Sequence, residues 1–194
     1  MASLFDQLES EAFRKGITAR SKEASVWFAK KAKELGPVGK KVLSDSRLGD
    51  GSDTKSGDMV MYIYDPKLKA TLPYYDTFPL TIVVGPAKDG FYGINLHYLP
   101  PNIRAIFLDK LGDVISNKKF NATTKFRITY NLLKATKNYK YFKPCFKHYL
   151  TKHVSSNISK VNASEWHIAI FLETAAFRKK STRFVWAQSR RQYR

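Results

Sequence analysis

Lysine and arginine residues recur every few positions through the last third of the chain, and aromatic residues stand among them. Basic side chains neutralise phosphate groups, and aromatic rings stack on exposed bases. The pattern therefore predicts a surface that binds the backbone of a nucleic acid without sequence preference. The candidate phosphate contacts are Lys118, Lys119, Lys125, Arg127, Lys134, Lys137, Lys140, Lys143, Lys147, Lys152, Arg178, Lys179, Lys180, Arg183, Arg190 and Arg191. The candidate base-stacking residues are Tyr139, Tyr141 and Phe142, for which helix packing is the alternative.

The positive charge of the chain is concentrated in this region. The 194 residues include 34 Lys or Arg and 16 Asp or Glu, which gives a formal net charge of +18. Residues 117–194 contain 18 basic and two acidic residues, and no acid lies between Asp113 and Glu165. Like charges repel one another in a compact state, so the run favours an anionic partner over the alternative of a solvated surface.

Few residues suit catalysis or metal binding. His148 and His153 are five positions apart, which is not the spacing of a metal pair on a helix. The basic region offers only Glu165 and Glu173 to hold catalytic metal ions, and no phosphate-binding loop or GxSxG motif occurs. The single cysteine, Cys145, cannot form an internal disulfide or a multi-thiolate zinc site. We predict a protein that is not an enzyme and needs no metal or other cofactor.

The elements that position these residues begin with a helical segment, residues 1–43. Ser3 and Ser21 stand before runs with apolar residues at helical spacing, which predicts helices over 4–14 and 22–35. Apolar residues make up 43% of the chain, which is enough to form a core.

The middle of the chain changes to a strand pattern. Residues 44–58 are rich in Ser, Gly and Asp and predict a polar connector. Three apolar runs, 59–64, 80–84 and 91–98, are separated by turn residues. We therefore predict a small antiparallel β domain at 56–101, an SH3-like sheet or barrel.

Residues 102–194 are predicted to form a basic helical region with a basic tail, so that the whole chain is of the α+β class. The expected helices cover 102–115, 123–135, a segment that starts at Pro144 and reaches about 152, and 165–177. Within the last of these, residues 166–172 also fit a strand. The tail begins at Arg178 and by itself also fits a disordered end.

Two long motifs carry a resemblance to a known family. They are YDPK…TLPYYDTFPL at 64–80 and GFYGINLHYLPP at 90–101. The similarity extends through Lys143-Pro144-Cys145 and Glu165-Trp166 to Ser189-Arg190-Arg191 and so covers most of the chain. The sequence resembles the DNA end protector proteins of T-even-like myoviruses and related marine phages.

The resemblance implies a virion protein that binds the termini of packaged linear double-stranded DNA. Such a protein is injected with the genome, shields the ends from the host RecBCD nuclease in the host cytoplasm, and acts with head or neck proteins in head completion. The resemblance carries over no catalytic residue, and the two motifs are assigned to the fold or to a docking surface.

Three other functions remain as alternatives. The first is a structural adaptor of a phage neck or baseplate without end protection, and the second is a metal-dependent nuclease. A peripheral membrane protein ranks last, because the basic segments lack a strongly amphipathic helix and no apolar run is long enough for a membrane span. We therefore expect no membrane partner.

Overall fold

The N-terminal helices begin and end where the sequence predicts. In the computed structural model, which describes residues 3–18, 21–116, 131, 133 and 143–191, α1 is Leu4–Arg14 and α2 is Lys22–Leu35. The Ser3 hydroxyl accepts hydrogen bonds from the Phe5 and Asp6 amides at 3.1 and 3.3 Å, and the Ser21 hydroxyl accepts one from Ala24 at 2.9 Å. These serines satisfy amides that have no partner within the helix.

The strands form one large sheet and one small one. The large sheet has six strands in the order β1-β7-β2-β4-β5-β6, and every neighbouring pair is antiparallel. Its strands are β1 (Leu48–Asp50), β2 (Met59–Met61), β4 (Leu80–Ala87), β5 (Gly90–Asn95), β6 (Phe146–Leu150) and β7 (Ser159–Val161). The small sheet pairs β3 (Tyr75–Asp76) with β8 (Phe177–Arg178).

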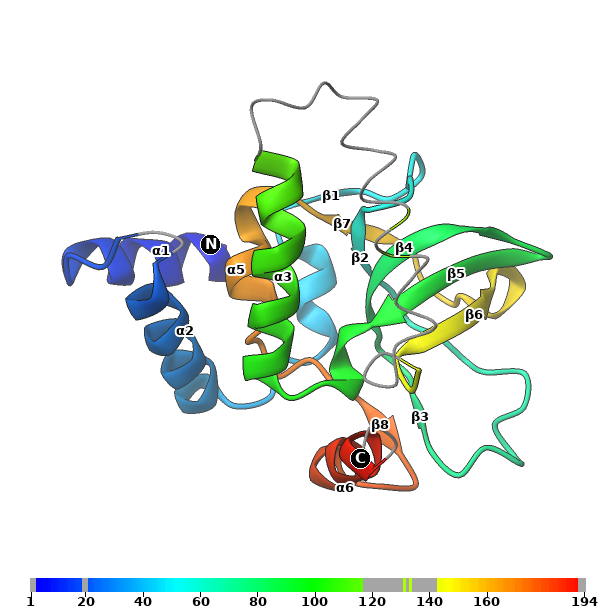
Figure 1. Cartoon of the computed structure of the whole chain (residues 1–194). Helices are drawn as coiled ribbons and strands as arrows, with labels where there is room; N and C mark the ends of the chain where they lie inside the picture. Colours follow the sequence, from blue (N-terminus) through cyan, green and yellow to red (C-terminus); the bar gives the residue numbers. More distant parts are fainter. Residues whose placement is uncertain (1–2, 19–20, 117–130, 132, 134–142, 192–194) are drawn as a thin grey trace.

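Helices complete the architecture (Figure 1). The α-helices that follow β5 in the chain are α3 (Pro101–Ser116), α5 (Trp166–Ala169) and α6 (Thr182–Arg191). Short 3-10 helices are η1 (Lys40–Ser44), η2 (Leu96–Tyr98), η3 (Thr151–His153) and η4 (Ala163–Glu165). The α+β class is therefore confirmed.

The prediction of an SH3-like barrel is not confirmed. The described strands make an open sheet whose edges are β1 and β6, with β7 inserted between β1 and β2. The reason is that the sheet takes strands from outside 56–101: β1 comes from the predicted connector at 44–58, and β6 and β7 come from the predicted helical region.

The helix predicted from Pro144 to about 152 is wrong, because Phe146–Leu150 is strand β6. This strand pairs with Gly90–Ile94 of β5. At Gly90 the two backbones approach so closely that a Cβ would lie 1.8 Å from the Tyr149 carbonyl oxygen. Pairing with a distant strand therefore overrides the local helical pattern.

The helix predicted over 165–177 is also wrong in most of its length. Only the single turn α5 is helical after η4, and the chain then runs on to β8. The residues from Thr182 to Arg191, which fitted a tail, form the helix α6. The helix predicted over 123–135 lies outside the described residues except for 131 and 133, which are helical, and Leu133 is buried as predicted.

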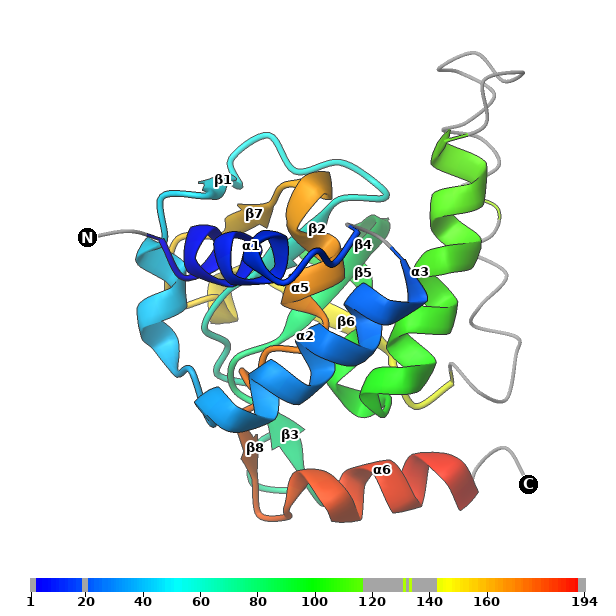
Figure 2. The same cartoon turned by 90° about the vertical axis from the view of Figure 1, so that its left-hand side faces the viewer.

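Two apolar clusters cover the two faces of the large sheet. The larger cluster lies where α1, α2, α3 and α5 pack against one face of the sheet (Figure 2). Its buried residues include Phe5, Phe28 and Phe107. The smaller cluster, around Tyr62 and Tyr149, lies on the other. In α3, Ile106 is 52% exposed and lies outside the core.

Candidate nucleic-acid interface

Nine of the sixteen predicted phosphate contacts lie in two segments of the described structure. One segment is β6 with its flanking turns, and the other is β8 with α6. The remaining seven, together with the three predicted stacking residues, lie outside the described residues: Lys118, Lys119, Lys125, Arg127, Lys134, Lys137, Lys140, Tyr139, Tyr141 and Phe142.

The helix α6 is fixed to the body of the protein along one side. Val185 and Ser189 of this side are fully buried. The Trp186 indole donates a hydrogen bond of 2.8 Å to the His97 carbonyl of η2, and the Arg104 guanidinium of α3 lies 5.8 Å from its ring centroid. These contacts fix one side of α6 to the protein, so the opposite side of the helix faces outward.

The outer side of α6 is cationic. Arg183 and Arg190 are seven residues apart and therefore share one side of the helix, with Arg191 next to them. All three are exposed. No acidic residue follows Glu173 in the sequence, so no acid interrupts this side.

The connection between β8 and α6 contains three more basic residues with different surroundings. Arg178 is exposed on β8. The Lys179 ammonium donates hydrogen bonds to the carbonyl oxygens of Ala70 and Leu72, at 2.9 and 2.8 Å. Lys180 lies 5.0 Å from the centroid of the Phe184 ring. Lys179 thus supports the loop before β3, a role that sequence reasoning missed.

On β6 the basic residues also differ from one another. Lys143 and Lys152 are exposed at the two ends of the strand. Lys147 is half-buried, and its Nζ lies 4.2 Å from the centroid of the Tyr98 ring. Burial lowers the pKa of the Lys147 ammonium, because a low-dielectric environment disfavours the charged form.

Ion pairs involve six of the 16 basic residues that the structure describes besides these nine. Lys31 lies 2.7 Å from Glu11 and Lys160 lies 2.8 Å from Asp58. Arg47 pairs with Asp6, Glu9 and Glu165. Within the described residues, the remaining ten, like the nine predicted phosphate contacts, have no carboxylate oxygen within 4.0 Å. Lys179 is already held by two carbonyl oxygens, so the charges most available to an external anion are those of the exposed Arg183, Arg190 and Arg191.

Comparison with known proteins identifies the family. Residues 4–193 match the family described as phage T4 terminal DNA protecting protein. The chain belongs to that family. The match confirms the resemblance on the two motifs and shows that this is a phage protein. No curated protein and no solved structure matches the chain.

The two motifs of the chain meet in a buried polar network. The Nδ1 atom of His97 lies 2.6 Å from Oδ2 of Asp76, and its Nε2 lies 2.9 Å from the Thr174 hydroxyl oxygen. Asp76 also accepts hydrogen bonds from the Asn95 side chain and the Phe78 amide, at 3.1 and 3.0 Å. The network thus joins the LPYYDTFPL and GINLHYLPP segments to the chain before β8.

The network has the connectivity of a nucleophile, a histidine and an aspartate, but its burial favours a structural role. Thr174 is 3% exposed and His97 is fully buried, so no substrate atom reaches the hydroxyl. Burial lowers the pKa of His97. Burial acts to raise the pKa of Asp76, but His97 and the hydrogen bonds outweigh it and lower that pKa overall. We assign a neutral imidazole that donates from Nδ1 to an ionised carboxylate.

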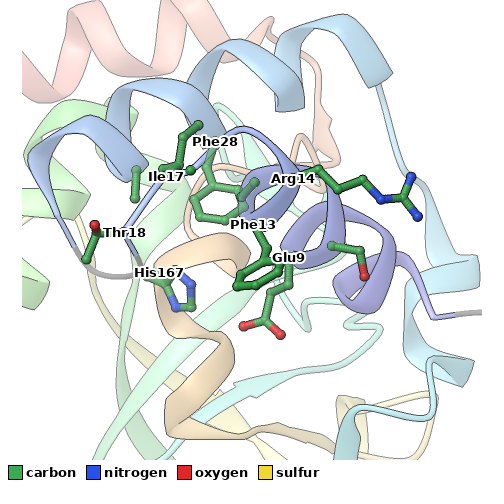
Figure 3. Close-up of a pocket in the computed structure, with 11 residues that line it drawn as sticks. Glu9, Phe13, Arg14, Ile17, Thr18, Phe28 and His167 are labelled. Atoms are coloured by element: carbon green, nitrogen blue, oxygen red, sulfur yellow. The ribbon is translucent and has the colours of Figure 1, made fainter.

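A cavity of about 670 Å³ lies between α1, α2 and α5, away from these basic segments (Figure 3). Phe13, Ile17 and Phe28 surround it, with Glu9 and Arg14 at its side. None of the nine described phosphate-contact candidates lines it. Over the described part of the chain, no three His, Cys, Asp or Glu residues come together as a metal site, and no helix has the length and hydropathy to cross a membrane.

Proposed function

We propose that this protein binds the ends of linear double-stranded DNA without sequence preference and shields them from exonuclease. The observation that carries the proposal is the outer side of α6, an ordered helix on which Arg183, Arg190 and Arg191 are exposed and, within the described residues, have no carboxylate partner. The name of the family supports the same function, because it describes protection of terminal DNA.

Phosphate neutralisation supplies the affinity in this proposal. Lysine and arginine side chains that contact phosphates displace counterions, and the resulting affinity falls steeply with salt concentration. The outer side of α6 suits this contact, because Arg183, Arg190 and Arg191 are exposed on an ordered helix. Phosphates are the same at every base pair, so such contacts give no sequence preference.

Protection is steric in this proposal, and the protein is not an enzyme. A nuclease that enters at a terminus needs the last base pairs to be accessible, and a bound protein covers them. The burial of Thr174, His97 and Asp76 supports this interpretation, because this constellation, which resembles catalytic machinery, is closed to substrate.

The setting of this activity belongs to the same proposal and rests on the family. The protein would occupy the virion, contact head or neck proteins during head completion, and enter the host cytoplasm with the DNA. The nuclease it excludes there would be RecBCD.

An exonuclease assay tests the proposal. Linear duplex DNA is digested by a nuclease that enters at duplex ends, with and without the protein, at about 50 mM and about 200 mM salt. We expect protection at low salt that weakens strongly at high salt. Equal digestion with and without the protein at low salt would contradict end protection and favour a structural adaptor of the virion.

A further inference from the structure

A second cavity lies beside β6, the first of the two basic segments. Its volume is about 320 Å³, and it is bounded by the loop before β3, by β6 and by η2. In Figure 1 that loop runs from β2 to β3 below β6, and α6 lies at its side. The polar and aromatic residues that line it include Tyr64, Lys67, Tyr74, Tyr75, Asp76, Asn95, Tyr98, Lys147, His148 and Tyr149.

One cation in the cavity wall has no anionic partner. Lys147 comes from β6, and its ammonium stands over the Tyr98 ring at 4.2 Å. Across the described residues, no carboxylate or hydrogen-bond acceptor pairs with this ammonium. A half-buried charge without an anion is costly, and a phosphate in the cavity would remove that cost.

The aromatic rings of the cavity form a connected wall. Tyr98 and Tyr74 both line it, with their ring centroids 6.1 Å apart. Tyr74 is only half-buried, and its ring packs edge-on against Phe184 of α6 at 6.3 Å. Aromatic faces beside a cation are the combination that binds single nucleotides of any sequence.

The polar groups at the floor of the cavity are engaged within the protein. The Asn95 amide donates to Asp76 and to the Tyr149 hydroxyl oxygen, each at 3.1 Å. The Tyr64 hydroxyl oxygen accepts a hydrogen bond of 3.1 Å from the Leu150 amide. These groups are therefore poorly placed to read the edge of a base, and stacking would dominate the interaction.

We propose that this cavity takes the terminal nucleotide of the DNA, with its phosphate at Lys147 and its base against the half-buried ring of Tyr74. The inference rests on the proposed function and adds a ligand subsite to it. Small-molecule sites usually have volumes of about 300–1,000 Å³, so a cavity of about 320 Å³ suits one nucleotide and excludes a base pair. The last pair must therefore open, which costs least where pairing is already weak.

The site supplies what the cationic surface lacks. Phosphate contacts are equally good along the whole length of a duplex, so they do not distinguish an end from the middle. A closed-circular duplex has no terminal nucleotide to place in the cavity. Occupation of this site would therefore give the protein its preference for ends.

The first test compares linear and closed-circular duplexes of the same sequence in a binding assay. Wild type is expected to prefer the linear form. Lys147→Met keeps the packing on Tyr98 but removes the charge, and we expect it to reduce that preference about tenfold. Lys147→Arg keeps the charge and should retain most of the preference. Lys152→Met, in η3 directly after the strand, is the matched control, and it should weaken binding to both forms alike.

The second test locates the nucleotide directly in the wild-type protein. A short duplex carries 5-iodouracil at its terminal position, and a second duplex carries it ten base pairs from either end. After irradiation, mass spectrometry is expected to find crosslinks to Tyr74 from the terminal position only. The free mononucleotide dTMP, added in excess, should compete for these crosslinks if the cavity recognises a nucleotide as such.

The outcomes separate this inference from the proposed function. If wild type prefers linear DNA but Lys147→Met keeps the full preference, or if terminal crosslinks avoid the cavity, the subsite is wrong and end binding stands. If wild type binds linear and circular DNA equally, end binding itself is contradicted, and the subsite fails with it.

Discussion

The His97 imidazole donates from Nδ1 to the Asp76 carboxylate across 2.6 Å, and both side chains are buried. This pair joins the two motifs that define the family resemblance. It also fixes the backbone that follows β3 and the backbone that precedes β8, because Asp76 accepts hydrogen bonds from the Phe78 and Ala176 amides. The two motifs therefore have a structural role: their residues hold together the segments that surround the second cavity.

The buried pair predicts that acid destabilises the protein. Burial lowers the pKa of His97, so between about pH 7.5 and about pH 5.5 the unfolded chain takes up a proton that the folded protein does not. The free energy of unfolding should fall over this range, as urea denaturation would measure. Asp76, whose pKa is also lowered, adds a further loss at lower pH.

A His97→Gln variant provides the control for this pH effect. It should be less stable than wild type at neutral pH, because it disturbs the hydrogen bonds to Asp76 and Thr174. Its stability should also depend less on pH between about 7.5 and about 5.5. An unchanged pH slope in the variant would show that other groups cause the loss.

A second prediction concerns Arg47, which pairs with Asp6 and Glu9 of α1 and with Glu165 of η4. Glu165 is fully buried, and Arg47→Met would leave its carboxylate without a cation. We expect the free energy of unfolding to fall by about 3 kcal/mol. The control Lys31→Met breaks a pair with the partly exposed Glu11 and should cost less than about 1 kcal/mol. Equal losses would contradict the special role of Arg47.

The third prediction concerns the outer side of α6. Replacing Arg183, Arg190 and Arg191 together by Gln should weaken DNA binding irrespective of sequence, because the change removes phosphate contacts. The slope of log affinity against log salt concentration should become shallower by up to about 2.7, since each contact contributes about 0.9. Binding titrations at several salt concentrations measure both effects.

A charge-matched variant controls for the loss of net charge. Lys22, Lys30 and Lys33 of α2 are exposed, and their replacement by Gln removes the same number of positive charges far from the basic segments in sequence. This variant should keep the wild-type salt slope. If the two triple variants behave alike, binding depends on net charge and not on the placement of α6.

The fourth prediction concerns Cys145, which is fully buried beside the start of β6. Burial raises the pKa of its thiol to about 12, so little thiolate is present at neutral pH. Ellman's reagent should react slowly with the native protein and rapidly in denaturant. Fast reaction under native conditions would show that the Pro144–Cys145 turn opens readily.

Short-range features of this protein could be predicted from its sequence. The boundaries of α1 and α2 follow from Ser3 and Ser21, because a capping hydroxyl bonds to amides only two or three residues away. The cationic character of residues 117–194 is likewise a property of composition. The two motifs are continuous stretches of the sequence, so the family could also be recognised without the structure.

Long-range features could not be predicted in this way. Residues 146–150 have apolar positions that fit a helix, and they form β6 because β5, more than fifty residues earlier, offers a strand edge with Gly90 at the close approach. The same pairing moves Lys147 from a helix surface to a cavity wall beside Tyr98. Charge and capping are local properties that the sequence determined by itself, whereas strand pairing and the surroundings of Lys147 depend on segments that meet only in the folded chain.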